Sequence, residues 1–223
     1  MKLIEFVSIL EFSSNKPLEP TPEPMIKHLP EWYKKAKKYF SEKNSTYKNC
    51  APFFDSMSAG YALLTPCDIS FFIEDGEPKV FLPKGYEGFV TERPPMGEFH
   101  SPTGHYKKHF AWSPSWGVRT PTGYSALYLT PLNMFSLPFT NTSGIIDSDK
   151  VYHPGNIPFF LKEGFTGVIP KGTPYIQVIP IKRDSWESNN VTVSVSDIEH
   201  FKPGSDRIPE YYKTKVWERK FYE

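Results

Sequence analysis

The chain has 223 residues, of which 39% are hydrophobic and 23% charged, and its 26 basic and 25 acidic side chains leave a formal net charge of +1. This composition excludes an intrinsically disordered chain, and the near-zero charge excludes a global field that draws the protein to nucleic acid. No stretch approaches the roughly 20 apolar residues of a membrane span. We therefore expect one folded unit that works in a cytoplasm, away from membranes.

Three patterns follow one another in the first 49 residues. The apolar run at residues 3–10 predicts a strand, because it is too short for a leader peptide and carries Glu5. Four prolines then predict an extended connector over residues 16–24. In residues 31–42 aromatic side chains recur at helical spacing, which predicts an amphipathic helix with its aromatic face inward. The lysines at 34–38 form its solvated face, with phosphate binding as the alternative.

From residue 50 onward, short runs of β-branched and aromatic residues lie between prolines and glycines, and this pattern predicts strands. The predicted strands cover residues 68–74, 79–82, 116–120, 125–130, 157–161 and 175–182. The 23 prolines place many of these strands at sheet edges or bulges. Residues 83–104 lack the pattern, and a segment of that length favours a functional loop.

The end of the chain changes character once more. Residues 191–195 alternate like a strand, and residues 210–222 predict a helix with a mixed aromatic and basic surface. This tail either packs on its own domain or contacts a partner. The predicted organisation is an N-terminal part, 1–49, a β core, 50–183, and a C-terminal strand and helical tail, 184–223, all within one globular unit.

Three short motifs occur in order along the core. Residues 58–63 read Ser-Ala-Gly-Tyr-Ala-Leu, residues 144–149 read Gly-Ile-Ile-Asp-Ser-Asp, and residues 171–179 read Lys-Gly-Thr-Pro-Tyr-Ile-Gln-Val-Ile. Together they resemble the first, third and fourth motifs of the dUTPase and dCTP deaminase superfamily. The resemblance implies a mainly β fold, the dUTPase-like β-clip, with residues 58–60 as a strand near the turn at 144–149. It also implies a homotrimer, because the related enzymes build their sites between subunits.

The chain departs from this superfamily where the enzymes carry charge. Ala62 stands where the first motif has the carboxylate that helps to position magnesium, and residues 131–133, Pro-Leu-Asn, lack the arginine of the phosphate-binding second motif. Catalysis that depends on preorganised charge loses most of its support without these groups. We therefore expect no hydrolysis of dUTP and no cofactor. Mg²⁺ is expected only under the alternative, a nucleotide pyrophosphohydrolase or deaminase relative with a site rebuilt around Asp147.

A second resemblance spans nearly the whole chain. Residues 29–35, Leu-Pro-Glu-Trp-Tyr-Lys-Lys, residues 50–55, Cys-Ala-Pro-Phe-Phe-Asp, residues 120–125, Thr-Pro-Thr-Gly-Tyr-Ser, and residues 172–174, Gly-Thr-Pro, are similar to landmarks of an uncharacterised protein family often encoded by phages. The resemblance implies a viral origin without a particular activity. The leading interpretation is a non-catalytic or altered binding or assembly module, in the host cytoplasm or in the virion.

Two sets of residues are candidates for a functional site. Asp147, Asp149 and His153 are the catalytic candidates, because a carboxylate at this turn could activate water and a histidine titrates near neutrality. Capping of a tight turn by the two carboxylates is the alternative. The candidates for binding a nucleotide or small molecule are Tyr61, Trp116, Tyr124, Tyr152, Lys171 and Gln177. The aromatic members either form a stacking surface, together with Trp112, or anchor the core.

The segment after residue 98 holds three closely spaced histidines, His100, His105 and His109, near Glu98. Imidazoles at this density could share a transition metal, but the spacing fits no standard metal signature. Three ligands must converge to hold an ion, and nothing in the sequence forces these to do so. They are weak metal candidates, solvated loop histidines are the simpler interpretation, and we predict no metal site.

Overall fold

The protein is described from a computed structural model, which describes residues 2–8, 19–41, 44–93, 100–194, 196 and 211–223. The fold is mainly β, as the sequence predicts, and every strand pair that the described residues form is antiparallel. None of the helices among these residues is long and apolar enough to cross a membrane.

The strands are, in chain order, β1 (Glu5–Ser8), β2 (Glu23–Pro24), β3 (Tyr39–Ser41), β4 (Asn44–Ser45), β5 (Tyr61–Leu64), β6 (Ile69–Glu74), β7 (Glu77–Phe81), β8 (Val90–Arg93), β9 (His105–Trp112), β10 (Trp116–Arg119), β11 (Tyr124–Leu129), β12 (Phe139–Asn141), β13 (Gly144–Ile146), β14 (Ile157–Lys162), β15 (Gly167–Ile169) and β16 (Pro174–Lys182). The helical segments are η1 (Met25–His28), α1 (Glu31–Lys35), η2 (Tyr47–Asn49), α2 (Ala51–Ser58) and η3 (Tyr212–Val216).

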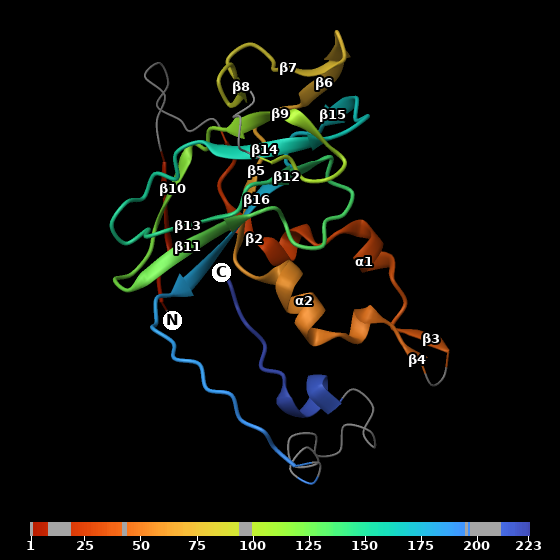
Figure 1. The fold of residues 1–223 in the computed structure, drawn as a ribbon, viewed down its shortest axis with the longest axis vertical. Coiled ribbons are helices and arrows are strands. Elements are labelled where there is room, and N and C mark those ends of the chain that lie inside the picture. The colour runs from red at the N-terminus through yellow and green to blue at the C-terminus, as the bar shows by residue number, and fades with distance from the viewer. Residues whose placement is uncertain (1, 9–18, 42–43, 94–99, 195, 197–210) are drawn as a thin grey trace.

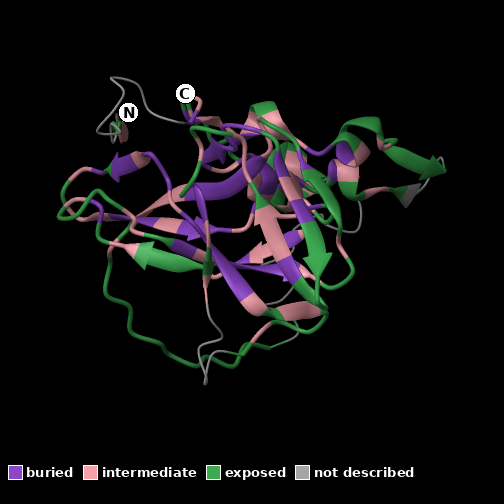
Figure 2. Cartoon of the chain, turned by 90° about the horizontal axis from the view of Figure 1, so that it is seen from above, coloured by how far each residue is buried: buried purple, intermediate pink, exposed green. Residues whose placement is uncertain are grey.

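Two sheets enclose the main core (Figure 1). One has the order β13-β11-β16-β5-β2 and the other β12-β14-β9-β8, so strands distant in sequence lie side by side. A third sheet, β15-β6-β7, extends the body at the top of Figure 1, and β1 pairs with β10. The buried side chains gather in the central strands, whereas the outer hairpins and loops are exposed (Figure 2).

Aromatic rings fill the space between the two large sheets. Trp112 of β9 stacks on Phe159 of β14 with ring centroids 4.0 Å apart, and Phe110, Phe139 and Tyr175 contact the same pair. All five side chains are fully buried. Buried aromatic side chains contribute large apolar areas and add about 1 kcal/mol per favourable ring pair. The prediction that Trp112 anchors the core is therefore confirmed.

Helix α2 covers the outer face of the five-stranded sheet. Pro52 lies in its first turn, where a missing N–H costs nothing, and Ser58 ends it by donating to the carbonyl of Phe54 at 3.0 Å. Gln177 of β16 fastens the helix to the sheet, because its amide nitrogen donates to the carbonyl oxygens of Ser56 and Ala59 at 3.0 and 2.7 Å. Gln177 is thus a buried bridge between β16 and α2.

Two predicted helices are largely wrong. The helix expected over residues 31–42 stops at Lys35, and the chain then forms β3, in which Tyr39 and Phe40 are exposed rather than packed inward. Only five residues lie between Pro30 and the extended Ala36, too few for local propensity to sustain more turns. In the tail predicted over 210–222, the described residues contain one helical turn, η3, after which residues 217–223 form no regular secondary structure.

The predicted strands agree with the structure more closely than the predicted helices do. All six strands predicted between residues 68 and 182 are present, with bounds shifted by at most two residues. Residues 191–194 form no strand, so that expectation is wrong, and residue 195 lies outside the described part. The segment 83–104 is not a simple loop, because β8 lies within it, while residues 94–99 lie outside the described part. Helix α2 and strand β9 were not predicted at all.

The first and third motifs of the resemblance lie in one sheet but do not pair. Residues 58–60 end α2 and lead into β5, so they are not a strand, and β5 is separated from β13 by β16 and β11. Gly60 lies at the closest approach between these elements, with φ +68° and its Cα hydrogen toward the backbone of β16. A Cβ added there would lie 2.0 Å from the carbonyl oxygen of Val178.

Gly60→Ala is predicted to lower the free energy of unfolding by about 2 to 5 kcal/mol, because it adds a left-handed backbone penalty to a backbone clash. Gly123→Ala is the matched control, since Gly123 has φ +82° but open space around its Cα. Its expected cost is about 1 to 2 kcal/mol. Urea unfolding of both variants measures the difference, and equal losses would contradict the close approach at Gly60.

Candidate functional site

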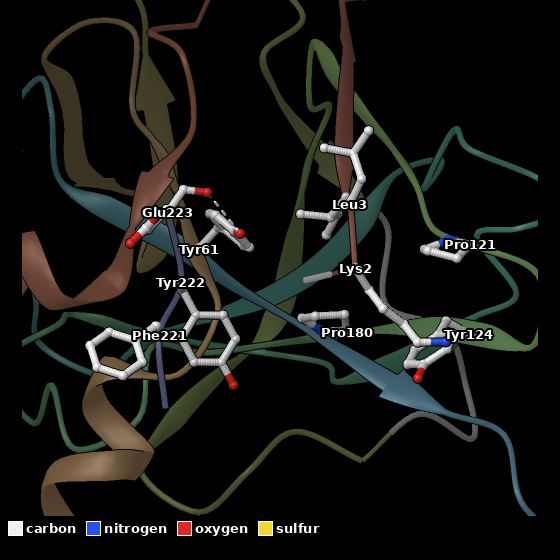
Figure 3. Close-up of a pocket in the computed structure, with 10 residues that line it drawn as sticks. Lys2, Leu3, Tyr61, Pro121, Tyr124, Pro180, Phe221, Tyr222 and Glu223 are labelled. Atoms are coloured by element: carbon white, nitrogen blue, oxygen red, sulfur yellow. Dashed lines mark hydrogen bonds between the residues drawn. The ribbon is translucent and has the colours of Figure 1, made fainter. Parts of the chain in front are cut away.

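Two of the predicted ligand residues, Tyr61 and Tyr124, line one cavity at an end of the sandwich (Figure 3). The cavity measures about 250 Å³. Its wall is mostly aromatic and aliphatic, and its lining comprises Lys2, Leu3, Ile4, Tyr61, Pro121, Tyr124, Pro180, Phe221, Tyr222 and Glu223. The cavity therefore joins the segment before β1, the five-stranded sheet and the C-terminal segment.

The sheet side of the cavity is fixed by local geometry. Tyr61 is the first residue of β5, and Phe6 of β1 packs edge-to-face on its ring at 5.1 Å. Tyr124 begins β11 directly after a tight turn in which its N–H donates to the carbonyl of Pro121 at 3.1 Å. Pro180 of β16 lies between the two tyrosines in Figure 3. The two rings thus face a common space from β5 and β11, the two strands that flank β16.

The C-terminal segment closes the other side, because α2 holds it in place. Asp55 of α2 accepts hydrogen bonds from Trp217 Nε1 at 2.9 Å and Lys220 Nζ at 2.8 Å. Farther along, the Tyr61 hydroxyl donates to the carbonyl oxygen of Glu223 at 3.1 Å, and the Tyr222 ring meets the Tyr61 ring at 5.9 Å. The expectation that the tail packs on its own domain therefore holds for residues 211–223.

The cavity is apolar with a few polar groups at its ends. Lys2 Nζ lies 4.5 Å from the centroid of the Tyr124 ring, a cation–π contact that leaves the ammonium group at one end (Figure 3). Burial raises the pKa of Tyr61 and of Tyr222. Both phenols therefore stay protonated near neutral pH and act as hydrogen-bond donors rather than as bases.

The catalytic candidates lie on a different face. Asp147 accepts a hydrogen bond from Ser125 Oγ at 2.8 Å, and Ser125 follows Tyr124 along β11. Successive strand residues point to opposite faces, so the carboxylate and the cavity are on opposite sides of the sheet. His153 takes no part in the cluster, because its Nδ1 accepts from the N–H of Gly155 at 2.7 Å.

Arg183, which the sequence analysis missed, neutralises both carboxylates. Its guanidinium forms a bidentate pair with Asp149 and lies 3.2 Å from Asp147. Asp149 also accepts the N–H of Gly123 at 2.9 Å, and these contacts with Arg183 and Gly123 lower its pKa to about 2. The Ser125 hydrogen bond, followed by the nearby Arg183 charge, lowers the pKa of Asp147. Such carboxylates are poor proton acceptors, and Asp149, through the N–H of Gly123, matches the turn-capping alternative, whereas Asp147 is held by side chains.

The remaining ligand candidates are dispersed. Trp116 donates from Nε1 to the carbonyl of Pro20 at 2.9 Å, which ties the connector to β10. Tyr152 packs near the Arg119 guanidinium, 5.9 Å from its ring centroid. Lys171 is exposed in the turn before β16, where its backbone N–H donates to Asp68 Oδ1. The structure therefore brings together Tyr61 and Tyr124 but not the other four.

The histidine cluster does not converge. His105 and His109 lie in β9 rather than in a loop, which corrects that part of the expectation. His105 Nε2 is 2.9 Å from Thr140 Oγ1, and His109 is buried against the Phe160 ring. His100 is exposed, and Glu98 lies outside the described residues. Within the described ranges, no three His, Cys, Asp or Glu side chains are placed to hold a metal ion.

The most perturbed carboxyl group belongs to Glu19, which sequence reasoning also missed. Its side chain is buried and accepts hydrogen bonds from Tyr175 Oη at 2.7 Å and Ser115 Oγ at 3.0 Å. Burial outweighs these bonds and raises the pKa of Glu19 to about 7. A raised carboxyl pKa is typical of catalytic acids, but Glu19 lines no cavity described here. It fastens the connector to the core.

No family model and no curated protein matches this chain. The site is therefore interpreted from its own geometry. An aromatic cavity can hold a flat ring, and the Lys2 ammonium group over Tyr124 can attract a negative substituent to that end, whereas Glu223 disfavours one beside Tyr61. Asp147 and Asp149 form a separate cluster with Arg183. This cluster joins the turn that follows β13 to the start of β11.

Arg183→Met is predicted to raise the pKa of Asp149 toward its ordinary value. A lowered folded pKa stabilises the fold above the unfolded pKa, so the variant should be less stable than the natural protein at neutral pH. The two stability curves should converge as pH falls from about 4 toward 2, where the natural Asp149 gains its proton. Lys182→Met is the neighbouring control, and unfolding midpoints across this pH range test the result. A gap that stays constant with pH would refute the electrostatic role.

Glu19 gives a pH dependence of opposite sign. Because its folded pKa lies above the unfolded value of 4.5, the fold binds the proton more tightly, and stability should fall by about 3 kcal/mol as pH rises from 4.5 to 7. Glu19→Gln stays neutral and should lack this component. The check is the difference in unfolding free energy between the two proteins at each pH, and a difference that does not vary would show that Glu19 does not titrate in this window.

Proposed function

We propose that this chain is a non-catalytic binding module, which holds a small planar ring with an anionic substituent in the cavity between Tyr61 and Tyr124. One observation carries the proposal: the aromatic cavity and the Asp147 carboxylate lie on opposite faces of β11. A ligand in the cavity therefore has no activated carboxylate beside it. Its neighbours are protonated phenols, apolar side chains, the Lys2 ammonium group near Tyr124 and Glu223 near Tyr61.

The size of the cavity restricts the ligand. At about 250 Å³ it falls below the roughly 300 to 1,000 Å³ of pockets that enclose drug-sized molecules. One aromatic ring fits, and the charged substituent then reaches Lys2 at the rim. Nucleobases with a phosphate and simple aromatic carboxylates share this chemistry. The Tyr61 hydroxyl, held by the carbonyl of Glu223, orients one wall before any ligand arrives.

The finer fold assignment is part of the same proposal. The ordered motifs support a β-clip relative, and β5 and β13 share one sheet, as a modified clip permits. Ala62, at the position of the carboxylate that helps to hold magnesium in the related enzymes, is buried. Residues 131–133, at the position of the phosphate-binding motif, have no arginine. A phage origin, with a place in the host cytoplasm or the virion, and assembly as a homotrimer remain predictions from the sequence.

The test is a thermal-shift series with nucleoside monophosphates and aromatic carboxylates, each with and without Mg²⁺. A ligand that binds only the folded state raises the melting temperature, so ring-bearing anions should do so independently of magnesium. Inorganic phosphate and aliphatic carboxylates supply the charge without the ring and should have little effect. No shift with any ring-bearing anion would refute the proposal.

Tyr222→Ala sharpens this test, because it removes one aromatic wall outside the main core. We expect affinity for the best ligand to fall about tenfold, the scale of one stacking contact. Tyr212→Ala, on the same segment but outside the cavity lining, is the matched control. Magnesium-dependent release of pyrophosphate from dUTP, abolished by Asp147→Asn, would instead establish the alternative of a nucleotide hydrolase with a rebuilt site.

A further inference from the structure

Two exposed surfaces of opposite charge lie at different parts of the molecule, one formed by the β3–β4 hairpin with the lysines that precede it and the other by the β6–β7 hairpin (Figure 1). The β3–β4 hairpin extends sideways beyond α1, and the β6–β7 hairpin extends from the top of the body. We call the first the basic arm, consisting of Lys35, Lys37, Lys38, Tyr39, Phe40 and Tyr47. We call the second the acidic hairpin, whose outer surface together with the neighbouring β15 presents Phe72, Glu74, Asp75, Glu77, Phe81 and Val168.

The basic arm combines cations with exposed aromatic rings. Phe40 is 89% exposed, and about half of Tyr39 and of Tyr47 is exposed. Four of its residues, Lys37, Tyr39, Phe40 and Tyr47, line a concavity of about 320 Å³ together with Ala36 and Thr46. In the part of the chain that the structure describes, no carboxylate forms an ion pair with Lys35, Lys37 or Lys38. The arm is therefore a hollow with exposed aromatic rings, beside which Lys37 and Lys38 carry positive charge, whereas the charge of Lys35 acts partly on Glu31.

The acidic hairpin has the complementary character. Glu74 and Glu77 lie directly opposite each other across the strands, and Asp75 follows in the two-residue turn. Like charges in directly opposed positions destabilise a hairpin, and no described cation forms an ion pair with these three. Next to them, the outer surface of the sheet carries the exposed side chains of Phe72, Phe81 and Val168. A set of cations at this tip would relieve the repulsion.

We propose that the acidic hairpin of one copy docks on the basic arm of a second copy of this chain. Three carboxylates then meet three ammonium groups, and the exposed rings Phe72 and Phe81 enter the hollow beside Phe40. Exposed aromatic side chains with a charged border are typical of protein interfaces. The contact uses side chains rather than strand addition, because Pro78 interrupts the donors of the β7 edge.

The symmetry of such a contact follows from its composition. The two surfaces differ and lie apart on one molecule, so the contact is head-to-tail, and it either closes into a ring or continues as a filament. It uses neither the aromatic cavity nor the tail that closes it, so it stands apart from ligand binding. A closed ring of three copies is the form that agrees with the homotrimer expected from the sequence.

Charge reversal on each surface tests the proposal by sedimentation at low ionic strength. The natural protein should form species heavier than its 25.7 kDa monomer, in amounts that rise with concentration and fall with added salt. The variants Lys37→Glu/Lys38→Glu and Glu74→Lys/Glu77→Lys should each associate on the order of tenfold more weakly or not at all, because like charges then face each other. An equimolar mixture of the two variants should restore the heavier species, and so should one chain that carries all four substitutions.

Glu187→Lys/Glu218→Lys is the matched control, since it changes the same number of charges on exposed residues outside both surfaces. Phe40→Ser provides a variant without charge reversal, at the most exposed ring of the arm, and should also weaken association. Far-ultraviolet circular dichroism checks that each variant folds. A natural protein that stays monomeric at every concentration would overturn the proposal, as would single-surface variants that assemble normally or a mixture that fails to restore assembly.

Discussion

The stacked rings of Trp112 and Phe159 are the contact on which the rest of the structure depends, because they join neighbouring strands in the middle of the core. Trp112 donates from Nε1 to Asn141, and Asn141 in turn donates to the carbonyl of Tyr175 at 2.7 Å. These bonds satisfy polar groups that would be costly to bury alone. They also link β9 and β12 of one sheet to β16 of the other.

Strand β16 connects this core to two outer segments. Tyr175 reaches Glu19 and so holds the connector that follows β1, whereas Gln177 holds α2 on the opposite face. Asp55 of α2 then accepts hydrogen bonds from Trp217 and Lys220 of the C-terminal segment. The walls of the aromatic cavity therefore come from segments at both ends of the chain, and each is positioned through a contact with β16 or with its neighbours.

Charge is distributed in three separate places with different consequences. At the start of β11, Arg183 compensates Asp147 and Asp149, and compensation of this kind favours a rigid turn over proton transfer. At the cavity rim, Lys2 is a single cation without such a partner among the described carboxylates, which favours recognition of an anion. At the basic arm and the acidic hairpin, the described residues form no ion pair with Lys37 and Lys38 or with Glu74, Asp75 and Glu77, and this favours contact between copies.

The sequence by itself determined the fold class and most strands of the core, since β-branched and aromatic runs between prolines are local signals for strands that pack on a half-buried surface. It also marked Tyr61 and Tyr124. It did not reveal that Tyr39 would join a hairpin rather than a helix, or that Gln177 would face α2. Nor did it reveal Arg183 or Glu19, because their partners lie 34 and 156 residues away along the chain. Only tertiary structure decides such contacts, since pKa values, cavities and complementary surfaces arise when distant segments meet.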